Sequence, residues 1–552
     1  MENKISKFEL IISVSLLVIG FSSCNNFLSI QPKTQIGDNT LWESTGNADL
    51  FLNGIYGQIP GPFNTDDPLE NFSDNSMNGI NGTPSRTLYA NSVYTSSNAP
   101  SYSASWGQLY ADIRKCNLFL EKVAASNISD STWEKQRLAE ARFLRAYFYQ
   151  LLWIQYGGVP IITDVLNRNT QGDEIFKARS TDDETFKFIT DECAAIADDL
   201  PIHADAGRAS RGAALTLQAW CELFEASPLK NPSNDKTKWE LAATTNRKVI
   251  DLDAYGLFSD YGTLFYEDNN NNEEVIFAKQ YLGGTPLGGS REGLQGPWHV
   301  GGIQLAYGGV DPTQELVDTY EMANGLPITD PASGYDPQNP YEGREKRFYE
   351  SIVYDGSTWA GSEMVMKQGV GSSNATDLSS ANEATNTGYY LRKGLNPKYA
   401  INGNNTQNSA NFIIFRYAEV LLSYAEAQNE TVGPDPSVYK AINQVRARSD
   451  LPPVPDGLSQ DEMRIKIHRE RRVELAFEGK RLYDLFRLKL AEKNLNGNLH
   501  AMLIEKESNK WQYNVIPAPD GERTFHANQN YLLPIPQSAI DQNSKLKQNP
   551  NY

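Results

Sequence analysis

The sequence is poor in the residues and motifs from which most catalytic sites are built. Its 552 residues include only five histidines, and none of them has the close spacing of zinc ligands. HExxH, GxSxG, GxxxxGKS/T and GxGxxG after a strand are all absent, which argues against metalloproteases, serine hydrolases and nucleotide-binding enzymes. A glycoside hydrolase needs only two carboxylates at a set distance, so the 68 acidic residues leave that class open.

Cysteine is also scarce. Apart from Cys24, the chain contains only Cys116, Cys193 and Cys221. Three widely spaced thiols argue against a disulfide framework. Each of them has apolar neighbours at helical spacing, which predicts three small buried residues.

Positive charge is in short supply as well. The chain has 50 Lys and Arg against 68 Asp and Glu, for a formal net charge of −18. Nucleic acid requires a basic binding surface, and anionic lipid headgroups attract basic segments. The composition therefore argues against a nucleic-acid partner and against attachment to a membrane by charge.

Long apolar runs are limited to one, at residues 10–21. This run is too short to span a bilayer as a stable helix, but it suits the apolar part of a signal peptide. Two serines and then Cys24 follow it, a pattern that resembles a bacterial lipobox. The resemblance implies a lipoprotein signal peptide at 1–23, lipid attachment to the Cys24 thiol and a polar, lipid-anchored tether at 24–40. The alternative is an ordinary signal peptide with a chance cysteine.

Apolar residues at helical spacing predict a mainly α-helical protein. In an N-terminal helical region, 41–254, we expect helices that pair and stack like tetratricopeptide repeats, because single pairs cannot bury their apolar faces. The expected N-terminal helices cover 41–57, 106–123, 133–156, 181–200, 211–226 and 239–252. The period fades over 255–410, which predicts a long irregular insertion with short strands at 274–278 and 351–354. Helices resume in the C-terminal region, 411–552, at 412–429, 437–448 and 460–493.

Four segments, taken together and in order, resemble the SusD/RagB-like family. Residues 142–147 with 156–160 resemble its N-terminal signature, and residues 416–427 are similar to its RxAEVxLxxAEA helix. Residues 470–485 resemble its ERRxELAFEGxRxxDL helix, and Leu533 to Pro536 with the last four residues resemble its LPIP…QNPxY ending. The charge pattern of the 470–487 segment predicts ion pairs that lock helices together, not a binding site.

The resemblance implies a SusD-like fold and a non-enzymatic, lipid-anchored protein of the outer membrane, exposed at the cell surface. Family members capture oligosaccharides or polysaccharides and deliver them to a SusC-type TonB-dependent transporter, the implied partner. Three alternatives stay open: a peptide or another nutrient as the ligand, an extracellular glycoside hydrolase, and an assembly scaffold without a small ligand. No cofactor is implied. The oxygen-rich segment 267–274 offers a possible Ca²⁺ site, with a solvated acidic turn as the alternative.

The ligand site has to come from loops, because a sugar needs an exposed aromatic ring to stack on and polar groups at its rim. Two loop regions offer such groups. The first contributes Asp74, Asn75, Arg86 and Tyr89, and the second contributes Trp298 and Tyr307, with Trp359 further along. Trp298 is the leading candidate, because it follows a proline in a glycine-rich stretch without periodic neighbours. A structural role for this ring is the alternative.

Overall fold

Helices dominate the part of the chain that the computed structural model describes, residues 41–285, 288–300, 303–304, 306–370, 378, 385–400 and 408–552. The predicted signal peptide, Cys24 and the tether lie outside the described residues. Within the described residues, no helix is both long enough and apolar enough to cross a membrane.

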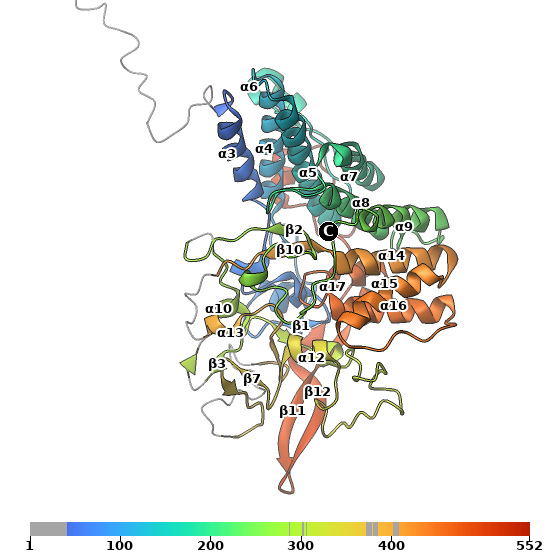
Figure 1. The fold of residues 1–552 in the computed structure, drawn as a ribbon. Coiled ribbons are helices and arrows are strands. Elements are labelled where there is room, and N and C mark those ends of the chain that lie inside the picture. Colours follow the sequence, from blue (N-terminus) through green and yellow to red (C-terminus); the bar gives the residue numbers. More distant parts are fainter. Residues whose placement is uncertain are drawn as a thin grey trace, which may run out of the picture.

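Nine helices form one continuous array, in which each packs against the next along the chain (Figure 1). They are α3 (Thr45–Tyr56), α4 (Trp106–Ala124), α5 (Ser131–Tyr156), α7 (Asp182–Ile196), α8 (Arg211–Ala226), α9 (Lys236–Ile250), α14 (Tyr417–Val432), α15 (Pro436–Arg448) and α16 (Gln460–Glu474). The contact between α9 and α14 joins the two helical regions across the long insertion. This arrangement confirms the predicted fold class, while the predicted region boundaries at 254 and 410 stay predictions.

Local sequence explains where these helices begin and end. Capping boxes start α7 at Thr181 and α16 at Ser459. In each, the hydroxyl of the cap residue accepts a hydrogen bond from the backbone amide of a glutamate three residues later, and the carboxylate of that glutamate accepts one from the backbone amide of the cap residue. Helix α5 ends at Gly157, whose φ of 73° is a conformation that glycine adopts without strain.

The insertion contains short helices and strands that lie below the helical array (Figure 1). Its short helices are α10 (Arg291–Gln295), α11 (Gln314–Val317), α12 (Lys346–Ser351) and α13 (Pro397–Ala400). Its antiparallel strand pairs are β1 (Ser76–Met77) with β5 (Asp311–Pro312), β2 (Val275–Lys279) with β10 (Phe412–Arg416), β3 (His299–Val300) with β4 (Ile303–Gln304), β6 (Ile352–Val353) with β9 (Tyr390–Leu391), and β7 (Thr358–Trp359) with β8 (Ser362–Glu363). Strands β1 and β10 come from outside it and tie it to the rest of the chain.

The predicted single helix over 460–493 is wrong. Helix α16 ends at Glu474, and the backbone turns through Phe477 and Gly479, with φ values of 64° and 70°. Helices α17 (Arg481–Arg487) and α18 (Ala491–Asn494) follow. The turn projects Glu478 and Lys480 toward other parts of the chain, so tertiary contacts override the helical pattern here.

The C-terminal region contains a long β-hairpin that the helical pattern does not predict. Strands β11 (Gly497–Glu507) and β12 (Lys510–Arg523) pair antiparallel and project from the lower end of the molecule (Figure 1). Ser508 and Asn509 form its two-residue turn, both with positive φ, as a type I′ turn requires. That Ser-Asn pair, inside a short polar stretch between two segments rich in β-forming residues, is the signal that could have identified the hairpin.

The apolar core is divided between the two parts of the fold. The largest cluster lies in the helical array, and a second lies in the insertion around Tyr320, Phe348 and Tyr389. Cys116, Cys193 and Cys221 are buried and free, which confirms the prediction made for them.

Candidate functional site

The two predicted ligand-binding loops meet in the structure. Strand β1 of the first loop pairs with β5, at the end of the second. The Gly79 amide donates to the Gly308 carbonyl at 3.0 Å, and the Thr313 hydroxyl donates to the Asp74 carbonyl at 2.7 Å. Segments more than 200 residues apart in the chain therefore form one loop face.

Close backbone approach holds this face together. A Cβ at Gly309 would lie 2.5 Å from the Leu294 carbonyl oxygen and 2.7 Å from that of Asp66. Any side chain there would separate the first loop from the second, because real Cβ atoms essentially never come that close. Gly309 instead donates its amide to the Leu294 carbonyl at 3.0 Å.

Asp74 and Asn75 attach the first loop to the C-terminal helices. The Asp74 carboxylate accepts from Arg481 at 2.7 and 2.8 Å and is 1% exposed. Burial raises the pKa of Asp74, but Arg472 and Arg481 outweigh it and hold that pKa well below the usual range. Asn75 donates to Glu70 at 2.7 Å and accepts from Arg472 at 2.8 Å.

Arg86 and Tyr89 are buried as well. Arg86 forms an ion pair with Asp520 on β12 at 2.7 Å. The Tyr89 ring lies parallel to that of Tyr94, with ring centroids 6.0 Å apart, and burial raises its pKa. In this structure the four side chains of the first loop anchor it and are not open to a ligand. Their role as ligand contacts stays a prediction.

Trp298 and Tyr307 are the candidates that keep some exposure. Both are half-buried and lie at the base of the β3–β4 hairpin. The Trp298 carbonyl accepts from the Ala306 amide at 3.5 Å, and the Tyr307 amide donates to Gly293 at 2.9 Å. Trp298 also packs on the second apolar cluster, and its indole Nε1 is buried, while the residue as a whole keeps intermediate exposure.

Trp359 does not match the expectation of an exposed ring. Its side chain is 2% exposed and belongs to the second apolar cluster. The Arg392 guanidinium lies 5.9 Å from the ring centroid, a cation–π distance. In this structure Trp359 supports the loop face from within.

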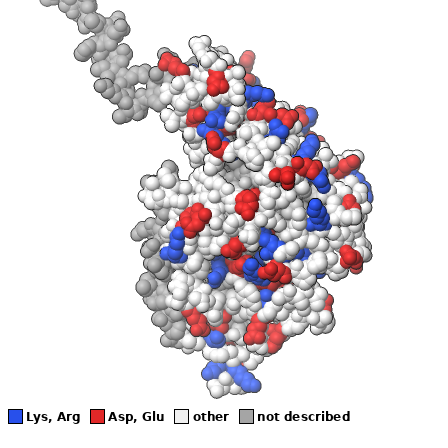
Figure 2. Space-filling model, viewed as in Figure 1, with Lys and Arg blue, Asp and Glu red and all other residues white. Residues whose placement is uncertain are grey.

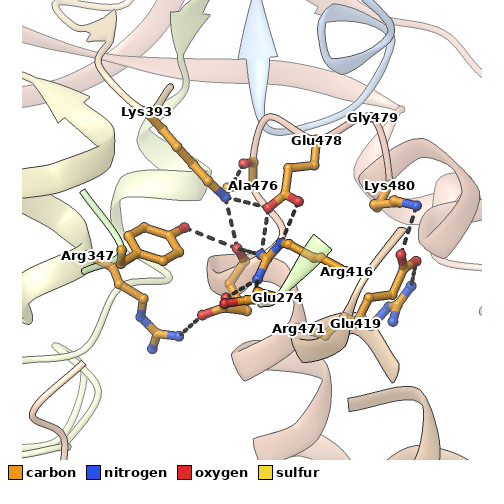
Figure 3. A network of polar contacts seen from close by, with 12 residues as sticks. Glu274, Arg347, Lys393, Arg416, Glu419, Arg471, Ala476, Glu478, Gly479 and Lys480 are labelled. Atoms are coloured by element: carbon orange, nitrogen blue, oxygen red, sulfur yellow. Dashed lines mark hydrogen bonds and ion pairs between the residues drawn. The ribbon is translucent and has the colours of Figure 1, made fainter. Parts of the chain in front are cut away.

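A buried ionic network connects the loop face to the helical array (Figure 3). At its centre, Arg416 donates to Glu274 and Glu474, both at 2.6 Å, and to Glu478 at 2.7 Å. All four side chains are at most 7% exposed. This confirms that the charged pattern of the 470–487 segment locks elements together.

Two cations extend this network into the insertion. Arg347 of α12 donates to Glu470 at 2.5 Å and to Glu474 at 2.9 Å. Lys393, just after β9, donates to Glu478 at 2.6 Å, and burial lowers the pKa of Lys393 to about 8. The candidate binding loops are therefore fastened to the rigid scaffold by charge-assisted hydrogen bonds.

The oxygen-rich segment 267–274 distributes its carboxylates to different cations. Glu267 pairs with Lys398 and accepts from the Tyr399 hydroxyl at 2.7 Å, whereas Glu274 lies in the buried network. Among the described residues, no group of three or more His, Cys, Asp or Glu is arranged to hold a metal ion.

Comparison with known proteins relates this geometry to characterised folds. A profile described as the SusD family matches residues 273–552, and one described as "starch-binding associating with outer membrane" matches residues 43–220. A SusD-like protein of Bacteroides ovatus is 25% identical over 597 residues, covering 99% of this chain and 98% of its own. A SusD-like protein of Formosa agariphila is 26% identical over 486 residues, covering 86% of this chain and 85% of its own.

The fold agrees with these sequence matches. The crystal structure of a SusD-like carbohydrate-binding protein from Bacteroides fragilis superimposes with a TM-score of 0.76 at 28% identity. It covers 92% of this chain and 100% of its own. The SusD profile alone spans half of the sequence, and the chain belongs to the SusD family.

Proposed function

We propose that this chain is a non-catalytic glycan-binding lipoprotein of the outer membrane. It captures an oligosaccharide or polysaccharide at the cell surface and delivers it to a SusC-type TonB-dependent transporter. Family membership, the carbohydrate-binding relative from Bacteroides fragilis and the outer-membrane association in the second profile's description support this proposal.

The observation that carries glycan capture is the position of Trp298. Trp298 is half-buried, packs on the second apolar cluster and lies close in the chain to the half-buried Tyr307. A supported, partly open ring can stack on the C–H face of a sugar at little cost in side-chain entropy. Such sites bind weakly, with dissociation constants on the order of micromolar to millimolar.

The test is a glycan panel screened by affinity gel electrophoresis, followed by calorimetry of each hit. Trp298→Ala should abolish binding. Trp133→Ala, which removes another half-buried tryptophan from α5 in the helical array, is the matched control and should bind normally. Binding that survives Trp298→Ala would move the site elsewhere on the loop face. Binding to no glycan at all would favour a peptide or another nutrient.

Non-catalysis, the anchor and the partner have separate tests. Bound glycan should be recovered intact after long incubation, and shortened products would point to a hydrolase instead. Cys24→Ala should release the protein from the membrane fraction and abolish incorporation of labelled fatty acid. The wild-type protein should co-purify with a SusC-type transporter from detergent extracts, and failure to do so would contradict delivery.

A further inference from the structure

A cavity of about 270 Å³ lies between the helical array and the loops. Described residues from η1 (Pro62–Asn64), α5, α8, α10, β10 and α17 line it. Its volume is close to the lower end of known ligand pockets, roughly 300–1,000 Å³, which suits one or two rings and not a polymer. Ser101 and Ser103 are exposed at its rim, so the cavity communicates with solvent.

Aromatic side chains make up much of its wall. They include Tyr102, Tyr147, Trp220, Phe412, Phe415 and Tyr483. Trp220 and Tyr483 meet edge to face, with ring centroids 5.7 Å apart. This wall offers flat apolar surface on which the C–H face of a small ring can pack.

Arg291 is the unusual polar group in this cavity. It is 7% exposed, yet no carboxylate of the described residues lies within 4.0 Å of its guanidinium. Its Nε donates to Gln295 at 3.1 Å, and the guanidinium lies 5.0 Å from the Phe63 ring centroid. No acceptor in the described part of the chain is hydrogen-bonded to either Nη group. Glu292, Glu478 and Glu70 favour its charge only from beyond contact distance, and a buried cation without a contact partner is costly.

The other charged groups that line the cavity, Asp67, Glu70, Glu478 and Lys480, already have partners within the chain. Asp67 accepts from the Ser85 hydroxyl at 2.5 Å. Glu478 accepts from Arg416 and Lys393, and Lys480 pairs with Glu419 at 2.9 Å. The two oxygens of Glu70 accept from Asn75 at 2.7 Å and from the Gly479 amide at 3.2 Å. The Nη groups of Arg291 are thus the donors that a ligand would have to bind. A carboxylate can accept two parallel hydrogen bonds from a guanidinium.

We propose that this cavity is a second ligand site, separate from the loop face, and that it binds a uronate. The carboxylate of the sugar pairs with the Nη groups of Arg291, and the ring packs on the aromatic wall. The proposal rests on the proposed function only in expecting a sugar as the ligand. Burial lowers the pKa of Arg291 to about 10, which leaves the guanidinium charged at neutral pH.

The test compares glucuronate and galacturonate with glucose, galactose and sulfate by calorimetry and thermal shift. Wild-type protein should bind at least one uronate, and Arg291→Met should weaken that binding at least tenfold. Arg168→Gln is the matched control, since Arg168 also has a cation–π contact, with Phe176 at 5.9 Å, but is exposed. Its uronate affinity should be unchanged, as should that of Trp298→Ala, which separates this site from the loop face.

A stability measurement distinguishes binding from structure. Because no carboxylate of the described residues forms a contact ion pair with Arg291, the melting temperature of unliganded Arg291→Met should equal or exceed that of the wild type. A clear drop in melting temperature would overturn the proposal, because Arg291 would then be structural. Equal binding of neutral hexose and uronate, equal binding of sulfate and uronate, retained binding in Arg291→Met, or binding of no uronate would each overturn it as well.

Discussion

Arg416→Ala should lower the free energy of unfolding by about 3–5 kcal/mol, because it removes one member of a buried ionic network and leaves its partners in place. The guanidinium is 1% exposed and contacts three carboxylates. Burial alone would raise the pKa of Glu478, but Arg416 and then Lys393 lower it from 4.5 to about 2. A net shift of that size corresponds to roughly 3 kcal/mol, to which Lys393 contributes as well as Arg416.

The pH dependence gives this prediction a second readout. A carboxylate with a lowered pKa in the folded state contributes stability that is present above its unfolded pKa and is lost as pH falls toward its folded pKa. For Glu478 that window runs from pH 4.5 to about 2. Without Arg416 the pKa of Glu478 should be less depressed, so the difference between variant and wild type should shrink between pH 7 and pH 3.

The assay is urea unfolding at both pH values, with Lys187→Ala as the control. Lys187 and Asp191 form an ion pair at 2.7 Å, but their side chains are 73% and 61% exposed. Removing that pair should cost about 0.5 kcal/mol or less. The reasoning would be refuted if Arg416→Ala cost under about 1 kcal/mol at pH 7, or if its cost were unchanged at pH 3.

Three further predictions concern other parts of the fold. Burial raises the pKa of Glu222 to about 7, so its contribution to stability is present below pH 4.5 and is lost as pH rises through 7. At pH 8, Glu222→Gln should therefore be more stable than wild type by up to about 3 kcal/mol and melt at a higher temperature. At pH 4.5 the two proteins should melt at the same temperature. A gain of the same size at both pH values would contradict this. Gly158→Ala should destabilise by at least about 2 kcal/mol, because its Cβ would lie 2.2 Å from the Ser180 carbonyl oxygen. Gly107→Ala, in α4 with open space around it, should instead stabilise by about 0.5–1 kcal/mol, and equal melting temperatures for the two glycine variants would count against the steric argument. Trp153→Ala, at 1% exposure, should cost about 3–5 kcal/mol in urea unfolding, and a loss below 1 kcal/mol would show that the site collapses.

Local pattern predicted the helical elements well, because an amphipathic period and a capping residue act within a few turns of chain. Helix α8 matches its predicted bounds, and α4 and α15 differ by one residue. The pattern failed at 412–416, the start of the helix expected over 412–429, because these residues form strand β10 and pair with β2. It failed again at 475–480, where the helical period continues but the turn serves contacts with distant residues. It also missed β11 and β12, whose signal is a two-residue turn inside a polar stretch.

The candidate site was less predictable, because exposure depends on what packs against a side chain from elsewhere in the chain. The sequence by itself determined the family resemblance, the mainly helical class and the two loop regions that meet at the loop face. Only the tertiary structure decided that Asp74 lies against Arg481 and Arg86 against Asp520, each more than 400 residues away in the chain. It likewise buried Trp359, left Trp298 half-buried and placed Arg291 in a cavity where no carboxylate of the described residues contacts its guanidinium. Period and composition report on neighbours along the chain, whereas burial and charge pairing are set by neighbours in space.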